Sequence, residues 1–246
     1  MAGVTAFVQA NGIDFGTGAD IATDIGTAFG YGAGELGEVL DVLTLGANSA
    51  NTDIAMLGET MKYAAADAHS LGLSLQETTA MAGILANAGI KGSMAGTTLK
   101  ETVKSLAVPD DKAKEVLERL KIKVYDEQGR RRDLTTLLRE VNEATQGLSQ
   151  EQKAADIQAI FKERGARGIL TLMSQGQDAF EEFLAALQSS AAGTVKRMQD
   201  IMAESLAAGL AGINSRKEAL FTTITESGRK QLVGIQLRCA GLSFRS

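Results

Sequence analysis

Residues 74–99 read SLQETTAMAGILANAGIKGSMAGTTL, and this stretch predicts two helices joined by a glycine-rich corner. Ser74 and Glu77 have the spacing of a capping box, in which each side chain satisfies a free backbone N–H at a helix start. Apolar residues then recur at helical spacing as far as Ala88. Gly89 stands where a left-handed residue would end the helix, because glycine takes a positive φ without steric cost. By itself this helical hairpin indicates no chemistry.

The second helix of the hairpin is expected to begin near Ser93, after a connection that contains Gly92. Gly96 leaves the first turn of this helix almost bare, so another helix could approach it closely. We therefore assign a structural role to Gly89, Gly92, Gly96 and the adjacent Thr97.

The composition favours a mainly α-helical protein with a sizeable core. The chain has 246 residues, of which 44% are hydrophobic, with 27 glycines and a single proline. A chain with one proline and abundant alanine and leucine is typical of helical proteins, and the glycines then serve as corners and close-packing points. The single cysteine, Cys239, excludes an internal disulfide framework and a cysteine zinc site.

Charge is distributed unevenly along the chain, although the net charge is only −5. Residues 1–99 carry ten acidic side chains against two lysines, whereas residues 100–139 carry eleven basic and eight acidic side chains. An acidic first region repels phosphate backbones, so generic nucleic-acid binding there is not expected. No stretch reaches the ~18 uncharged apolar residues that a membrane span requires, and no basic segment precedes an apolar run as in a secretory signal.

Hydrophobic periodicity predicts a multi-helix core with one short β-hairpin. The hairpin is expected at about residues 121–132, where Ile122 and Val124 alternate with lysines and a turn signal with Asp126 and Gly129 follows. Helices are expected at about residues 19–29, 35–45, 52–70, 74–88, 93–108, 110–120, 133–146, 149–161, 169–173 and 179–187, and in a longer segment after Gly193.

Three regions are expected along the chain. Residues 1–192 form the helical core, in which Phe161 points inward and Gly165 begins a turn that ends at Gly168. Residues 193–233 form an extended amphipathic helix with a thin apolar stripe, which would pack on a partner helix or on another copy of the chain. Residues 234–246 lose this pattern and are expected to be frayed.

The candidates for catalysis and ligand binding are few. The single histidine, His69, has no metal-ligand spacing around it, and Cys239 has no histidine partner in the nearby sequence. The glycines of residues 30–34 lack the preceding strand and following lysine of a phosphate loop. Residues 89–92 match the Gly-x-x-Gly form of a KH loop without the sheet that such a domain requires. No catalytic, cofactor or metal site is therefore assigned, and the chain is expected not to be an enzyme.

Arg130, Arg131 and Arg132 form the only basic cluster. Such a run usually lies on a solvated edge, where it discourages strand pairing. The alternative is contact with an acidic partner or with DNA phosphates. This alternative would make the chain a helical nucleic-acid-binding or assembly-scaffold module.

A series of motifs resembles the core domain of tail tape measure proteins of tailed bacteriophages, the phage-related minor tail protein family. The motifs are LGANSANTD at residues 45–53, MKYA at 61–64, AHSLGLSLQET at 68–78 and LANAGIKGSMAGT at 85–97. The resemblance continues through VYDEQGR at 124–130, the leucines of 134–138, and QAIF at 158–161 with Gly165, Ala166 and Gly168. It covers roughly residues 15–195, with the motifs in the family's order and spacing.

This resemblance implies a structural protein of a phage or prophage tail. Tape measure proteins extend inside the tail tube, set its length during assembly and leave ahead of the DNA at infection. The implied partners are the tail tube protein, the tail assembly chaperones and further copies of the chain, with transient contact to phage DNA. The implied location is the tail lumen of the virion, after assembly in the host cytoplasm, and no cofactor or small-molecule substrate is implied. Family members are usually much longer, which leaves three alternatives open: a full-length chain, one piece of a split gene product or a truncated prophage remnant.

Overall fold

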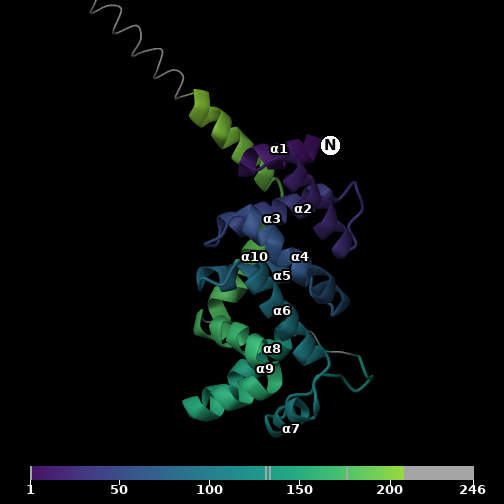
Figure 1. Cartoon of the computed structure of the whole chain (residues 1–246), viewed down its shortest axis with the longest axis vertical. Coiled ribbons are helices and arrows are strands. Elements are labelled where there is room, and N and C mark those ends of the chain that lie inside the picture. Colours follow the sequence, from purple (N-terminus) through teal and green to yellow (C-terminus); the bar gives the residue numbers. More distant parts are fainter. Residues whose placement is uncertain (1, 131, 133, 176, 208–246) are drawn as a thin grey trace, which may run out of the picture. The chain divides into compact units, whose positions relative to one another are not determined.

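The computed structural model describes residues 2–130, 132, 134–175 and 177–207, and its contacts divide the chain into two units, Met1–Arg197 and Met198–Ser246. The first unit contains ten labelled helices (Figure 1). They are α1 (Ala2–Asn11), α2 (Phe15–Ala28), α3 (Leu36–Asn48), α4 (Ile54–Ser70), α5 (Leu75–Asn87), α6 (Gly92–Ala107), α7 (Asp111–Arg119), α8 (Leu134–Gln146), α9 (Gln150–Gln175) and α10 (Gln177–Ser190). The expected mainly helical fold is confirmed.

The helix α5 lies at the centre of the first unit. It packs against α3, α4, α6, α9 and α10, and every residue from Thr78 to Ala86 is buried. No charged residue follows Glu77 in this helix, so all of its faces can lie in the core without leaving a charge unpaired. The helix α6 packs between α4 and α9 (Figure 1).

The β-hairpin expected at residues 121–132 is wrong, because the described residues there form no strand and contain only one bridge residue, Tyr125. The chain reverses direction there through a turn, in which the N–H of Asp126 donates to the carbonyl of Arg130 at 2.8 Å and that of Arg132 to the carbonyl of Val124 at 3.0 Å. Ile122 and Val124 are both buried, but they are loop residues that follow the end of α7. The N–H of Ile122 donates to the carbonyl of Leu117 at 2.8 Å, which is the bond that closes a Schellman helix end. Ile122 is therefore buried at a helix end and Val124 in the turn that follows, and an alternation over three residues is too short to distinguish this arrangement from a strand.

The first residues of the chain also differ from expectation. Two helices, α1 and α2, form where the sequence predicted one, and they pack on each other and on α3. Asp14 begins α2 by accepting the N–H of Thr17 at 2.9 Å. Hydrogen bonds from the hydroxyl and the N–H of Thr17 lower the pKa of Asp14.

The turn expected between Gly165 and Gly168 is wrong as well. Both glycines are helical, and α9 bends three residues earlier, at Lys162, where φ is 57° and ψ is −173°. Neither glycine nor proline occurs at this kink, so the local sequence does not predict it. The two halves of α9 bury different side chains, Ile160 and Phe161 before the kink and Ile169 after it.

Replacing Lys162 by glycine should stabilise the protein by about 1 kcal/mol, because only glycine adopts this φ and ψ without strain. The lysine contacts Asp110 at 3.7 Å with both side chains largely exposed, so losing that ion pair should cost little. Urea unfolding would measure the change. Glycine at Gln158, an exposed residue in the regular part of α9, is the control and should destabilise by about 1 kcal/mol. A lower free energy of unfolding in K162G would show that the backbone of Lys162 is not strained.

The second unit is described over residues 198–207, which are helical and carry the exposed side chains of Ile201, Met202 and Leu206. Residues 194–197 of the first unit are also helical. The remaining part of the extended helix expected at 193–233, and the frayed end expected at 234–246, lie outside the described residues. The proposed boundaries of the three regions stay predictions.

Candidate functional site

Local hydrogen bonds fix both the start of α5 and the corner that joins it to α6. The hydroxyl of Ser74 accepts the N–H of Glu77 at 3.1 Å, and the Glu77 carboxylate accepts the N–H of Ser74 at 2.8 Å. At the other end of α5, Gly89 has a φ of 84°. The N–H of Ile90 donates to Leu85 and that of Gly89 to Ala86, each at 2.9 Å. This is a Schellman motif, and it turns the chain into α6.

Gly92 and Gly96 place α6 directly against α4. A Cβ atom at Gly96 would lie 2.5 Å from the carbonyl oxygen of Thr60 and 2.6 Å from the Cβ of Tyr63. The hydroxyl of Thr60 donates to the carbonyl of Gly92 at 3.1 Å. Thr97, next to Gly96, is half-buried. The backbones approach so closely that a side chain at Gly96 would collide with the neighbouring helix.

Gly165 and Gly168 allow α9 to pack closely against α6. A Cβ at Gly165 would lie 3.2 Å from the backbone nitrogen of Thr102, and one at Gly168 would lie 2.4 Å from the Cγ2 of Thr98. The hydroxyl of Thr102 donates to the carbonyl of Gly165 at 3.3 Å. Phe161, one turn earlier, is fully buried. The helix α6 thus makes two close contacts, one with α4 at its own Gly96 and one with Gly165 of α9.

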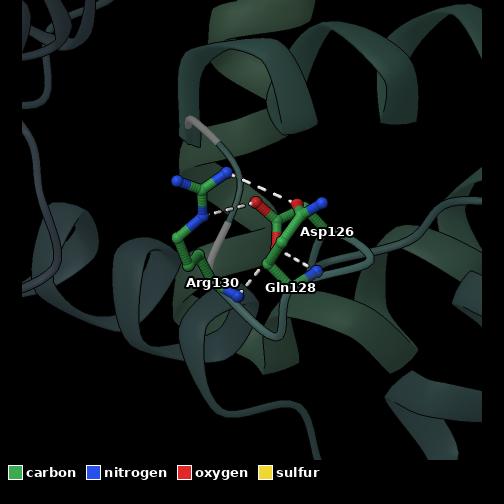
Figure 2. Close-up of polar contacts among 3 residues, drawn as sticks. All are labelled: Asp126, Gln128 and Arg130. Atoms are coloured by element: carbon green, nitrogen blue, oxygen red, sulfur yellow. Dashed lines mark hydrogen bonds and ion pairs between the residues drawn. The ribbon is translucent and has the colours of Figure 1, made fainter.

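The loop at residues 126–130 is closed by one carboxylate (Figure 2). Asp126 accepts the N–H of Gln128 at 2.9 Å, the N–H of Arg130 at 2.8 Å and the Nε of Arg130 at 2.9 Å. Gly129 has a φ of 73°, and its N–H donates to the carbonyl of Asp126 at 3.1 Å. Arg130 therefore has an internal counter-ion although it is largely exposed.

Arg132 is also paired within the chain. Its guanidinium makes a bidentate contact with Glu140 of α8, at 2.9 and 2.5 Å. The hydrogen bond from Arg132 lowers the pKa of Glu140. Arg131 lies outside the described residues. Two of the three arginines in the predicted basic cluster thus already contact carboxylates, which weakens the cluster as a binding surface for phosphates.

Asp67 joins α4 to α6. Its carboxylate contacts the ammonium groups of Lys100 at 3.1 Å and Lys104 at 3.2 Å. Partial burial acts to raise the pKa of Asp67, but the two lysines lower it below its usual value. This contact supports the same pair of helices that Gly96 brings together.

Three residues that are important for the fold were not predicted from the sequence: two aspartates and one strained lysine. Asp156 of α9 is buried and paired with Arg119 of α7, Asp41 of α3 binds backbone near Gly193, and Lys162 carries the kink. Only Asp156 had a signal, since it lies four residues before Ile160 on the buried face of a helix.

A mostly apolar cavity of about 130 Å³ lies among α8, α9, α10 and α5. Its lining includes Leu138, Ile169, Phe180 and Met81, with one carboxylate, that of Glu181, and no histidine or cysteine. Such a lining suits an apolar group rather than acid–base chemistry.

Among the residues placed by the structure, no three His, Cys, Asp or Glu side chains are grouped to hold a metal ion. His69 is exposed, and its ring packs edge-on against Phe29 with centroids 5.6 Å apart. Within the described helices, none is long and apolar enough to cross a membrane. Cys239 lies outside the described residues.

Comparison with known proteins identifies the family of this chain. The sequence matches the family described as phage-related minor tail protein over residues 1–162, which includes the α5–α6 corner and its packing against α4. The chain belongs to this family. The expected resemblance is thereby confirmed, and the chain is a phage tail protein.

Two curated relatives are similar to this chain beyond residue 162. The tape measure protein of Pneumococcus phage Dp-1 is 32% identical over 237 residues, which is 95% of this chain and 20% of that relative. The probable tape measure protein of Escherichia phage P2 is 29% identical over 200 residues, 80% of this chain and 24% of that relative. The chain therefore spans about a fifth to a quarter of the curated relatives that it matches. No solved structure matches it.

As a phage tail protein, the chain is a virion component. The residues that the sequence singled out, from Ser74 to Gly165, lie in helix caps, corners and helix contacts. The structure thus presents the glycine-packed contacts of α6 with α4 and α9 as the candidate site.

Proposed function

We propose that the chain is a segment of a tail tape measure protein. In this role it extends in the tail lumen, contributes to the length of the tail during assembly, and is released ahead of the DNA at infection. The observation that carries the proposal is the pair of relatives named tape measure protein and probable tape measure protein, which are similar over 95% and 80% of this chain.

The proposed role is structural and not enzymatic. The described residues that match the family form helix caps and close helix contacts, and the cavity beside α8 is mostly apolar. The proposed partners are the tail tube protein, the tail assembly chaperones and further copies of the chain, in the host cytoplasm during assembly and in the tail lumen afterwards. The alternative, a nucleic-acid-binding module, is weakened because Arg130 and Arg132 contact Asp126 and Glu140.

Tail length in the intact phage tests the proposal. Helical inserts of 27 and 54 residues placed after Gly193 should lengthen the tail by roughly 40 and 80 Å, because an α-helix rises 1.5 Å per residue. Electron microscopy of purified tails measures this directly. Tails of unchanged length would show that this segment does not contribute to tail length. A lengthening proportional to the insert would support the proposal.

A further inference from the structure

A short break separates α10 from the helix that follows it. α10 ends at Ser190, residues 191–193 are not helical, and the next helix begins at Thr194. The break depends on Gly193, whose φ is 74°. The sequence around it, QSSAAGTVKR at residues 188–197, contains no proline and only this one glycine. The local sequence is thus compatible with a continuous helix.

A carboxylate from a distant part of the chain holds one side of the break. Asp41 of α3 accepts the N–H of Gly193 at 2.7 Å through Oδ2 and the N–H of Val195 at 2.9 Å through Oδ1. It therefore acts as the N-cap of the following helix, although it lies more than 150 residues away. Asp41 itself is half-buried, and Val195 is buried beside it.

The guanidinium of Arg197 binds the other side of the break, at the end of α10. Arg197 donates to the carbonyl of Ser190 at 2.7 Å and to that of Ala192 at 2.5 Å. It also donates to the hydroxyl of Thr194 at 2.6 Å. The carbonyl of Ser190, the last residue of α10, and that of Ala192 in the break thus accept from a side chain and not from the backbone.

A continuous helix would satisfy the same four backbone groups. In an α-helix each N–H donates to the carbonyl four residues earlier. The amides held by Asp41 would then donate to the carbonyls of Ser189 and Ala191. The carbonyls held by Arg197 would accept from Thr194 and Lys196. The two forms therefore satisfy these four backbone groups differently: side chains pair with them in the broken form, and the backbone pairs with them in the continuous form.

We propose that Asp41 and Arg197 form a latch that keeps this junction broken, and that opening the latch joins α10 to the following helix in one continuous helix. Residues 177–207 would then form a helix of roughly 46 Å. Burial of Ala191, Thr194 and Val195 at the junction favours the closed form in the native chain. This inference concerns the fold and holds whether or not the chain determines tail length.

The distance between two spin labels tests the latch. Labels attached to cysteines at Ala185 and Ala203, both exposed, in a chain with Cys239 replaced by serine, would lie roughly 27 Å apart, measured between Cα atoms, in a continuous helix. Asp41→Asn removes the carboxylate and should raise the ratio of continuous to broken form at least tenfold. The control is Asp24→Asn, an exposed aspartate on α2, which should leave the distance distribution unchanged.

Gly193→Ala provides a second route that leaves α3 intact. Alanine disfavours the positive φ of the break and favours a helix, so this variant should also raise the population at the helical distance about tenfold. Thermal unfolding should show that both variants keep a folded core. An unchanged or merely broadened distance distribution in folded D41N and G193A chains would overturn the latch, since it would show a frayed junction without a continuous state.

Discussion

Replacing Gly96 by alanine is expected to lower the free energy of unfolding by about 2–3 kcal/mol, because the added methyl group overpacks the contact between α6 and α4. The Cβ would lie 2.5 Å from a backbone carbonyl oxygen of α4, so the helices themselves must separate. Separation would also disturb the contacts of Asp67 with Lys100 and Lys104. Alanine is the better helix former, so any loss must come from packing.

Gly37→Ala is the matched control for this substitution. Gly37 lies in α3 and is exposed, and a methyl group added there would meet no other atom within 4 Å. The same chemical change there should stabilise the protein by up to about 1 kcal/mol. Urea unfolding of both variants measures the difference. Equal effects at positions 96 and 37 would show that the close approach of α4 and α6 does not exist in solution.

Removing Arg119 should also be costly, because it leaves the carboxylate of Asp156 buried without its cation. Asp156 retains only 4% of its side-chain exposure, whereas Arg119 is 54% exposed. Oδ1 of Asp156 also accepts from Gln152 at 2.7 Å, while Oδ2 has no partner among the described residues. We expect Arg119→Ala to destabilise by about 2–3 kcal/mol, reduced from the effect at a fully buried pair by the exposure of the arginine.

The asymmetry of this ion pair gives the decisive comparison. Asp156→Asn removes the buried charge and leaves an arginine that can reach solvent, so the double variant should be more stable than Arg119→Ala alone. Lys114→Ala is the control, since its ion pair with Asp111 is exposed and should change stability by less than about 0.5 kcal/mol. If Arg119→Ala and Lys114→Ala change the free energy of unfolding equally, the burial of Asp156 does not make the loss of its cation destabilising.

Features that depend on neighbours in the chain could be read from the sequence. The capping box of Ser74 and Glu77 joins residues three apart, and Gly89 ends α5 through hydrogen bonds spanning three and five residues. The burial of α5 on all sides follows from its lack of charge after Glu77. The family resemblance could also be recognised from the sequence, because its motifs follow one another in order along the chain.

Short sequence patterns gave wrong predictions where the same pattern is compatible with two local structures. The alternation of Ile122 and Val124 suits either a strand or a buried helix end. It is the packing after α7 that selects the helix end. The glycines at 165 and 168 suit either a turn or a close contact, and the threonines of α6 select the contact.

The amino-acid sequence alone determined that this protein is mainly helical, where most helices begin and end, and which phage tail family it belongs to. Only the tertiary structure decided the kink at Lys162, the pairing of Arg119 with Asp156, and the capping by Asp41 of the helix that begins at Thr194. The physical reason is the distance along the chain. Hydrogen bonds between close neighbours are encoded in spacing, whereas a carboxylate that meets an amide more than 150 residues away leaves no periodic trace in either segment.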